Sequence, residues 1–420
     1  MHGVATKDTI FIIGAGAAGI AAAIFARRSN PGRQVVLLDS ARKPGAKILV
    51  SGGGRCNVTN SVVNEGDFWG GKRTVVRQIL RAFPAYRTVE FFRDLGVGLH
   101  EEADGKLFPD SNRARDVLDA LLLAASECGV DFRPGIRVLS VSRANSGFDL
   151  ATSAGALHAA DTVLATGGQS LPKTGSDGAG YGLAQAAGHT IVPLTPALAP
   201  LVLDPDTPYS IHRRVPGVAV DAAITVWVDG AVALRLSGAL LWTHFGVSGP
   251  VVLNASRHWA RAKVEGRGVR LTLSFHPGAS FDDVDARWTS GLHARPGATV
   301  RSLLASDLPD ALALAILAVL AIPADRLLAE LSREDRRRLV HALTEWPLPV
   351  LDTRGYNYAE ATAGGVALDE IDPRSMESRV CPGLYLVGEI LDVDGRIGGF
   401  NFQWAWSTAF VAGRALARRA

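Results

Sequence analysis

Two short apolar runs near the amino terminus flank a longer segment of small residues. Ile10–Ile13 and Gln34–Leu38 are almost wholly aliphatic or aromatic, which is typical of strands buried on both faces of a parallel sheet. The segment between them, Ala17–Arg28, is rich in alanine and carries charge only at its end, so it is expected to be a helix. The strand–helix–strand order predicts the first unit of a parallel α/β sheet.

Further periodic segments continue this pattern. Val75–Leu95 and Ala114–Cys128 have helical spacing, and Ser111 or Asn112 is expected to cap the second helix. Gly45–Asn60 is predicted to be a loop because glycine and serine dominate it. Three further segments are strand-like: Ile136–Val141, Phe148–Thr152 and Thr162–Ala165.

The pattern changes at about Pro193. Short alternating segments, Ala223–Val228 and Ala231–Leu236, indicate antiparallel strands. From Ala279 the pattern is mostly helical, with predicted helices at Val300–Leu308, Ala311–Leu320, Ala324–Leu331 and Arg333–Leu343. The chain then returns through Leu351–Ala363 to the first domain. The predicted parts are 1–192 and 346–420 for a split domain, 193–275 for an inserted β subdomain and 276–345 for an inserted helical subdomain.

Composition limits the class of protein. With 420 residues, 47% of them hydrophobic and 20% charged, the chain is a folded α/β protein of more than one domain. The net charge of +3 permits an RNA partner without indicating one. The three cysteines are far apart in sequence, which favours a reducing compartment and excludes a redox disulfide or a cysteine metal site. No metal is predicted.

Two segments resemble membrane spans at first sight. Thr9–Ala26 is uncharged, but its glycines fall where a strand must turn into a helix. Ala311–Ile322 is apolar for only about three helical turns and is followed by Pro323, so it is expected to be a buried helix. We therefore expect a cytoplasmic protein without membrane contact.

A glycine motif marks the first strand–helix turn. Gly14, Gly16 and Gly19 have the G-x-G-x-x-G spacing that allows a tight turn, approach of a pyrophosphate and close helix packing. Asp39 ends the next strand, where a carboxylate accepts hydrogen bonds from a ribose. A chance match in a chain rich in glycine is the alternative, but the flanking strand and helix are those that a dinucleotide site requires.

The carboxyl end supplies a second set of signals. The apolar strand Leu384–Val387 ends in Gly388-Glu389, and Gly398-Gly399 precedes Asn401, which is expected to start the helix Phe402–Ala417. A helix start there suits the pyrimidine edge of a flavin. An enzyme that uses only a nicotinamide has no need of this element, whereas FAD spans both ends of such a domain. The fold class expected is α/β, an FAD-binding Rossmann-like three-layer split domain with an inserted antiparallel β subdomain and a helical subdomain.

Two middle segments complete the predicted FAD site. Ser51–Asn60 places three consecutive glycines beside Arg55, which offers backbone donors near a cation, and Ala165-Thr166-Gly167 ends a returning strand. The cofactor contacts predicted from all motifs are Gly14, Gly16, Ala17, Ala18, Gly19, Asp39, Ser40, Lys47, Ser51, Gly52, Gly53, Gly54, Arg55, Cys56, Asn57, Val138, Ala165, Thr166, Gly167, Gly364, Gly388, Glu389, Asp394, Gly399, Phe400 and Asn401.

Long motifs give the chain a specific resemblance. Ser51–Asn60, Trp242–Pro250, Thr362–Val366 and Gly383–Trp406 together resemble the BaiN/YhiN-like bacterial flavoproteins, also called aminoacetone-oxidase-like FAD proteins. The resemblance implies a split FAD domain with two insertions. It also implies one of several reactions: reduction of conjugated C=C bonds in bile-acid enones, reduction of a uridine in large-subunit ribosomal RNA, or oxidation of aminoacetone.

This chain departs from the family pattern at three places. Asp39 stands where a glutamate is frequent, Lys106 stands where arginine is more usual, and Arg396-Ile397 lies close to the expected flavin position. We expect these differences to affect the substrate more than the cofactor.

The catalytic residues are less defined than the cofactor site. His244 is the first candidate for the acid that protonates a substrate carbon, with Tyr356, Tyr181 and Cys56 as weaker ones. A structural role for His244 in its turn is an equal alternative. Because no second dinucleotide motif follows a strand, NAD(P)H is expected to bind only transiently as the electron donor.

Three functions remain open from the sequence. The first is an NAD(P)H-driven flavin reductase of an activated C=C bond, in a small enone or in uracil of ribosomal RNA. The second is an oxidase of a small amine or amino ketone, and the third is an RNA-binding protein with structural FAD. Arg333, Arg336, Arg337 and Arg338 could contact RNA, although a solvated helix face is the more frequent reason for such a run. The oligomeric state stays open.

Overall fold

The computed structural model describes residues 8–418, which form two compact units. Unit 1 contains the chain up to Leu194 and again from Glu360, and unit 2 is the continuous segment Thr195–Ala359. The return to unit 1 therefore lies at residue 360, later than the predicted 346. The reason is that the segment from Trp346 to Thr353 contributes two strands to the sheet of unit 2.

A five-stranded parallel sheet forms the centre of unit 1, in the order β21-β11-β1-β2-β7. Its strands are β1 (Ile10–Ile13), β2 (Val35–Asp39), β7 (Asp131–Pro134), β11 (Asp161–Leu164) and β21 (Leu384–Leu386). The three central strands are buried almost throughout because layers of structure cover both faces of the sheet. Strand β21 comes from the carboxyl end of the chain, so the predicted split domain is confirmed at this edge.

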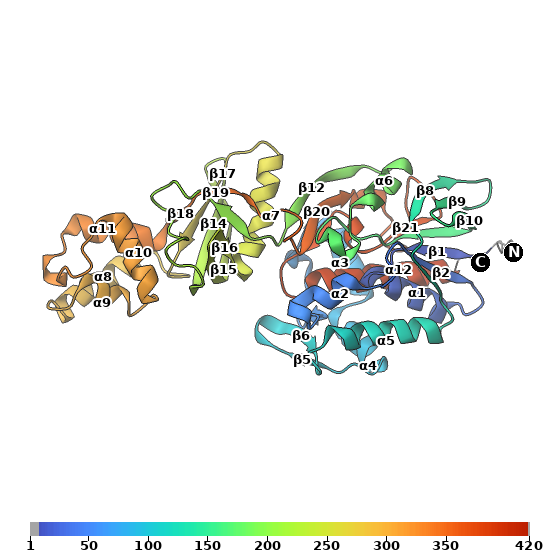
Figure 1. The fold of residues 1–420 in the computed structure, drawn as a ribbon, viewed down its shortest axis with the longest axis horizontal. Helices are drawn as coiled ribbons and strands as arrows, with labels where there is room; N and C mark the ends of the chain where they lie inside the picture. The colour runs from blue at the N-terminus through green and yellow to red at the C-terminus, as the bar shows by residue number, and fades with distance from the viewer. Residues whose placement is uncertain (1–7, 419–420) are drawn as a thin grey trace. The chain divides into compact units, whose positions relative to one another are not determined.

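Two helices from opposite ends of the chain pack together beside this sheet, as Figure 1 shows for the blue α1 and the red α12. Their bounds are α1 (Ala17–Ser29) and α12 (Phe400–Arg418). Gly413 makes the approach close, since a Cβ there would lie 2.6 Å from the Cβ of Phe25. The predicted helix beginning at Phe402 starts two residues earlier.

The remaining helices of unit 1 correct two expectations. Val75–Leu95 is not one helix, because Pro84 lacks the N–H that a helix interior needs and separates α3 from α4. Neither Ser111 nor Asn112 caps α5; the helix follows Arg113, whose side chain makes no cap. The bounds are α2 (Ala46–Val50), α3 (Arg73–Ala82), α4 (Ala85–Asp94), α5 (Ala114–Glu127) and α6 (Ala179–Ala186).

Small sheets complete unit 1. One is antiparallel, in the order β10-β9-β8, and the others are β3-β6-β5, β22-β4 and β12-β20. The bounds are β3 (Thr59–Asn60), β4 (Phe68–Gly70), β5 (Leu99–Glu101), β6 (Lys106–Pro109), β8 (Val138–Arg143), β9 (Phe148–Thr152), β10 (Gly155–Ala159), β12 (Ile191–Ala197), β20 (Ala361–Val366) and β22 (Val393–Gly395).

Unit 2 contains a seven-stranded sheet in the order β18-β17-β14-β15-β16-β13-β19, and its paired strands are antiparallel. Helix α7 (Pro250–Val264) contacts several of these strands. The strands are β13 (Leu201–Leu203), β14 (Ala219–Val228), β15 (Ala231–Thr243), β16 (Gly246–Ser248), β17 (Val269–Ser274), β18 (Trp346–Leu348) and β19 (Val350–Thr353).

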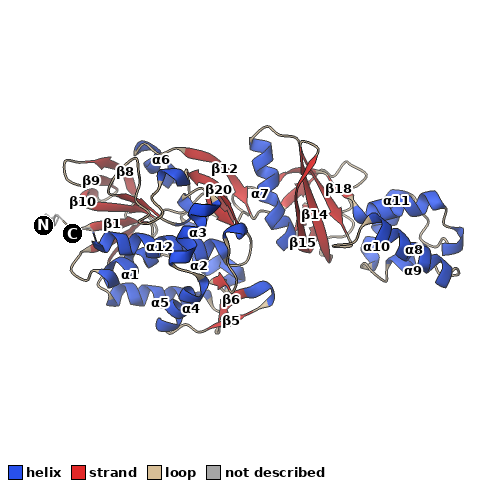
Figure 2. Cartoon of the chain, turned by 180° about the vertical axis from the view of Figure 1, so that it is seen from behind, coloured by secondary structure: helices blue, strands red, loops and turns tan. Residues whose placement is uncertain are grey.

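The helices of unit 2 other than α7 gather in one cluster, labelled in Figure 2. They are α8 (Phe281–Ala294), α9 (Val300–Leu304), α10 (Asp310–Leu320) and α11 (Arg333–Thr344). The predicted helix Ala324–Leu331 is wrong, because only the short 3-10 helix Leu328–Glu330 forms there. Among the helices of residues 8–418, none has the length and apolar character required to cross a membrane.

Candidate functional site: the cofactor cradle of unit 1

The turn between β1 and α1 has the shape of an anion site. Gly14 has φ of 109°, and a Cβ on it would lie 2.4 Å from the carbonyl oxygen of Ala165. A Cβ on Gly19 would meet the Gly14 carbonyl oxygen at 1.8 Å, so only glycine fits these two positions. In contrast, a Cβ on Gly16 meets no atom within 4 Å. Gly14 and Gly19 therefore serve packing, and Gly16 leaves open space above the backbone.

The start of α1 leaves its N–H groups available to a ligand. Gly16 stands at the N-cap without a side-chain cap, and the first turn contains no acidic residue. The unpaired N–H groups and the helix dipole at such an end attract anionic oxygens. Thr166, on the neighbouring strand end, has a buried hydroxyl without a partner among the described residues. The open glycine and the bare helix start fit a bound dinucleotide, while the Thr166 hydroxyl lies against Gly180 of α6.

Asp39 shapes the same turn from the end of β2. One carboxylate oxygen accepts the N–H of Ala15 at 2.6 Å, and the other accepts the N–H of Ala41 at 2.7 Å. Burial raises the pKa of this carboxyl, while the two backbone donors partly offset the rise. Each oxygen keeps a second lone pair, so Asp39 can hold the turn and still accept a bond from a ribose hydroxyl.

The glycine-rich segment Gly45–Asn60 contains more regular secondary structure than its composition predicts. Helix α2 and the 3-10 helix Ser51–Gly54 occupy part of the predicted loop. Gly52, Gly53 and Gly54 all have positive φ, and a Cβ on Gly53 meets nothing within 4 Å. The backbone of this segment is therefore exposed in a conformation that side-chain-bearing residues rarely adopt.

Arg55 and Cys56 are neighbours in sequence with different surroundings. The Arg55 guanidinium donates to Glu102 at 2.6 Å and lies 4.0 Å from the centre of the Phe108 ring. Cys56 is fully buried, and this burial raises the pKa of its thiol to about 12. Cys56 presents no surface to a cofactor or substrate, which argues against both of its predicted roles.

Exposure separates the predicted cofactor residues into two groups, all on unit 1. Residues with accessible surface are Gly14, Gly16, Ala17, Asp39, Ser40, Lys47, Ser51, Gly52, Gly53, Gly54, Arg55, Asn57, Thr166, Gly167, Glu389, Gly399 and Asn401. Buried residues are Ala18, Gly19, Cys56, Val138, Ala165, Gly364, Gly388, Asp394 and Phe400. The second group supports the site from beneath its surface.

Asn401 bonds the first turn of α12 to β22. Its side-chain oxygen accepts the N–H of Gly395 at 2.8 Å, and its amide donates to the Gly395 carbonyl at 3.1 Å. Asn401 therefore ties α12 to β22 and does not begin the helix as expected. A Cβ on Gly399 would lie 2.4 Å from the Thr59 carbonyl, which explains the second glycine before the helix.

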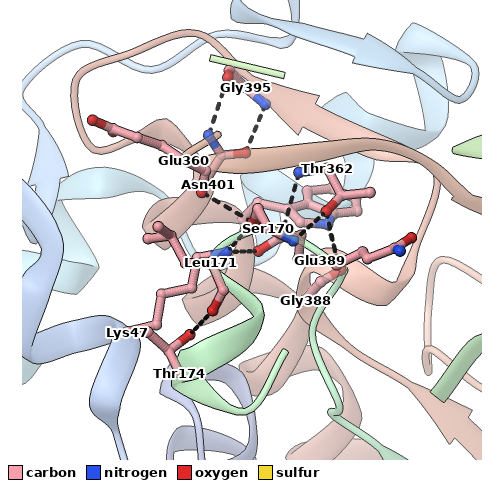
Figure 3. A network of polar contacts seen from close by, with 12 residues as sticks. Lys47, Ser170, Leu171, Thr174, Glu360, Thr362, Gly388, Glu389, Gly395 and Asn401 are labelled. Atoms are coloured by element: carbon pink, nitrogen blue, oxygen red, sulfur yellow. Dashed lines mark hydrogen bonds and ion pairs between the residues drawn. The ribbon is translucent and has the colours of Figure 1, made fainter. Parts of the chain in front are cut away.

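A network of polar contacts surrounds Glu389 and is drawn in Figure 3. Lys47 donates to Glu389 at 2.5 Å and to Ser170 at 2.6 Å. Thr362 donates its backbone N–H to Glu389, and its hydroxyl accepts the N–H of Gln169. Sequence reasoning missed Ser170 and did not select Thr362, although Thr362 lies in a motif that carried the family resemblance. Their partners are between 27 and 219 residues away, so no local signal identifies them.

The catalytic candidates of unit 2 come from two loops. His244 is exposed in the turn between β15 and β16, and Tyr356 follows β19. Arg354 connects the loops, because its guanidinium lies 4.2 Å from the Phe245 ring centre and 3.5 Å from that of Tyr358. Burial raises the pKa of the Tyr356 phenol. The weaker candidate Tyr181 is buried in α6 of unit 1.

Comparison with known proteins identifies the family. The chain matches the HI0933-like protein Rossmann domain over residues 8–415. It is 35% identical over 412 residues to the 3-dehydro-bile acid Δ(4,6)-reductase of Clostridium scindens, covering 98% of this chain and 100% of that protein. This chain belongs to the HI0933-like family. The resemblance to BaiN/YhiN-like flavoproteins is thereby confirmed, and the chain is an FAD-dependent oxidoreductase.

A second relative of this HI0933-like protein carries a different activity in its name. The ribosomal RNA dihydrouridine synthase of Escherichia coli is 35% identical over 405 residues, covering 96% of this chain and 97% of that one. Among solved structures, Escherichia coli quinol fumarate reductase FrdA matches with a TM-score of 0.52 at 16% identity, over 98% of this chain and 70% of that one. This likeness confirms the predicted fold class and carries no further argument.

Proposed function

We propose that this HI0933-like protein reduces an activated C=C bond, with NAD(P)H as electron donor. The main support for this proposal is the chemistry that the names of two relatives share. Each relative is 35% identical to this chain and is matched along nearly its whole length. A 3-dehydro-Δ(4,6) bile acid has double bonds conjugated to a ketone. Making dihydrouridine likewise reduces the ring double bond next to a carbonyl. Reduction of a double bond activated by a carbonyl is the activity that fits both.

Unit 1 supplies the binding groups for the cofactor in this proposal. The backbone at Gly14 and Gly16, with the start of α1, holds the pyrophosphate, and Asp39 accepts a ribose hydroxyl. The chemistry that bound FAD supplies is hydride donation from N5 to the electron-poor carbon of the double bond. No other part of the proposed reaction requires a redox group from the protein.

Unit 2 supplies the proton. Addition of hydride to one carbon leaves negative charge on the carbon next to the carbonyl, which must gain a proton. We propose that His244 or Tyr356 donates it. For Tyr356 the support is its position just after β19, two residues from the Arg354 that contacts the His244 turn, and its phenol carries a proton at neutral pH. For His244 the support is its exposed position on a turn that Phe245 and Arg354 fix to the second loop.

The substrate class we favour is a small enone. Two of the four arginines considered for RNA are paired within unit 2: Arg336 with Asp285 at 3.0 Å, and Arg338 with Asp335 at 3.0 Å. Ion pairs of this kind leave fewer cations for phosphates. We propose a cytoplasmic location, which the three free cysteines support.

The test is anaerobic turnover with NADH or NADPH and two substrates, a 3-oxo-Δ4,6 steroid acid and a uridine-containing ribosomal RNA transcript. The expected result is a steroid product two hydrogens heavier and a stoichiometric loss of reduced nicotinamide. Reduction of the RNA alone would move the substrate to uridine and keep the chemistry. Consumption of neither substrate, with flavin bound and reducible, would contradict the proposal.

The acid is identified by the variants His244→Gln and Tyr356→Phe, with Tyr358→Phe as the matched control. The variant that removes the proton donor should lower kcat by about a hundredfold or more with little change in KM. If Tyr356 is the donor, the rate of the unmodified enzyme stays level as pH rises toward 10, because the pKa of its phenol lies above the ordinary value of 10.0. Unchanged kcat in both variants would exclude both residues.

A further inference from the structure

Three donors from other parts of unit 1 hold the Glu389 carboxylate. One oxygen accepts the Ser170 hydroxyl at 2.8 Å and the Thr362 N–H at 2.9 Å, and the other accepts Lys47 at 2.5 Å. The side chain is only 16% exposed. Figure 3 shows these donors converging on Glu389 from separate segments. Both lone pairs of one oxygen and one lone pair of the other are used, so Glu389 has little acceptor capacity left for the direct cofactor contact expected from the Gly388-Glu389 motif.

Lys47 has donor capacity left. Its ammonium has three N–H groups, and its acceptors among the described residues are Glu389 and the Ser170 hydroxyl. Ser170 can accept from Lys47 because its own proton goes to Glu389. The Lys47 side chain is 25% exposed, so it is not sealed inside unit 1. The network thus holds one cation in place and leaves one N–H for a ligand.

The neighbours of this network contact the start of α1. Gly45, two residues before Lys47, donates its N–H to the Ala15 carbonyl at 3.0 Å. Gly388, next to Glu389, lies so close to α1 that a Cβ on it would be 2.8 Å from the Cβ of Ala18. Both sides of the network therefore border the turn whose free N–H groups suit an anion.

We propose that Lys47 donates its remaining N–H to an anionic oxygen of the FAD pyrophosphate, and that Glu389 and Ser170 are positioning residues for this ammonium. Glu389 acts through Lys47 and makes no cofactor contact of its own. A lysine already fixed by two acceptors loses little side-chain freedom when the ligand binds. The inference depends on FAD binding alone and is independent of the reaction proposed above.

The test is a double-mutant cycle read by FAD affinity of the flavin-free protein. Lys47→Met keeps the aliphatic stem, and we expect it to weaken FAD binding by about ten- to a hundredfold, the value of one charge-assisted bond. Glu389→Gln should weaken binding less, and adding it to Lys47→Met should cause no further loss. Lys43→Met, at an exposed lysine four residues earlier, is the matched control and should bind as the unmodified protein does.

One outcome of the double-mutant cycle would contradict the positioning role of Glu389. If the two losses multiply, Glu389 binds FAD directly and the positioning role is wrong. Ser170→Ala provides a milder variant should Glu389→Gln fail to fold, which thermal unfolding of the flavin-free protein reports. It should weaken FAD binding severalfold in the unmodified background and not at all beside Lys47→Met.

The midpoint potential of bound FAD distinguishes the phosphates from the flavin ring. The charge of the pyrophosphate does not change on reduction, so Lys47→Met should leave the potential unaltered. If Lys47 contacts the ring instead, its loss weakens binding of reduced FAD more than of oxidised FAD. A tenfold difference between the two corresponds to a fall of about 30 mV for two electrons. A fall of that size would overturn the assignment to the pyrophosphate.

Discussion

Polar side chains around the cofactor cradle are held by backbone groups. Asp39 accepts the N–H of Ala15, and Asn401 bonds to both backbone groups of Gly395. Such bonds fix the turns that present bare N–H groups to a ligand. At the scale of the residue, the motif side chains therefore shape the loops, and backbone atoms offer much of the binding surface.

Cys56 gives a pH-dependent prediction. Burial raises its pKa from 9.0 to about 12, so between these values the unfolded chain loses a proton that the folded chain keeps. The unfolded state then binds fewer protons, and stability falls as pH rises by up to about 1.4 kcal/mol per unit from this group. We expect Cys56→Ala to show a shallower loss of stability between pH 9 and 11, measured by urea unfolding.

The same variant tests the catalytic assignment of Cys56. The kcat of Cys56→Ala should equal that of the unmodified enzyme. In the unmodified folded protein, Cys56 should resist alkylation at pH 8. Rapid alkylation, or a pH slope equal in both proteins, would show that the thiol is accessible.

At the scale of elements, the contact between α1 and α12 joins the two ends of the chain. Small residues bring these helices together, with Gly413 facing Phe25 and the backbone N of Ala26. Because α1 begins after Gly16 and α12 begins at Phe400, beside the second glycine motif, this contact holds two predicted cofactor motifs in one unit.

Two glycine-to-alanine changes in helices should have opposite effects. Gly413→Ala places a Cβ 2.6 Å from the Cβ of Phe25 and 2.8 Å from the Ala26 nitrogen, so we expect a loss of about 1–3 kcal/mol. Gly182→Ala, in α6, meets no atom within 4 Å and should gain about 0.5–1 kcal/mol through helix propensity. Scanning calorimetry of both variants checks the prediction. A neutral Gly413→Ala would mean that the helices are farther apart.

At the scale of the whole molecule, unit 2 is one continuous insertion into unit 1. The chain leaves through β12 and returns into β20, and these strands pair with each other. A Cβ on Gly364 would be 2.3 Å from the Pro193 carbonyl, so the backbones are in direct contact just before the exit and after the return.

This arrangement predicts that unit 1 binds FAD alone. A variant that replaces residues 195–359 with a short glycine-serine linker should fold, bind FAD and show an oxidised-flavin spectrum, because the described cradle lies within unit 1. It should lack reductase activity, since both proposed acids are removed. Flavin absorbance during reconstitution with FAD measures this. Failure of a folded deletion variant to bind FAD would show that unit 2 contributes to the cofactor site.

The sequence predicts what is encoded locally. The β1–α1–β2 unit follows from continuous apolar runs and glycine spacing within thirty residues. Pro84 divides the predicted helix Val75–Leu95 into two, and part of the predicted loop forms α2 and the 3-10 helix Ser51–Gly54. The Lys47–Glu389 pair joins residues 342 positions apart, so only tertiary structure brings it together. The assignment of Trp346–Thr353 to unit 2 depends on strand pairing for the same reason.

The most direct test of the central claim is a single-turnover experiment that needs no nicotinamide. The flavin of the purified protein is reduced photochemically without oxygen and then mixed with the 3-oxo-Δ4,6 steroid acid. The account predicts rapid return of the oxidised-flavin spectrum and one equivalent of product with a reduced double bond. A flavin that stays reduced with the steroid and with uridine-containing RNA, but is reoxidised rapidly by oxygen, would contradict a C=C reductase and indicate an oxidase.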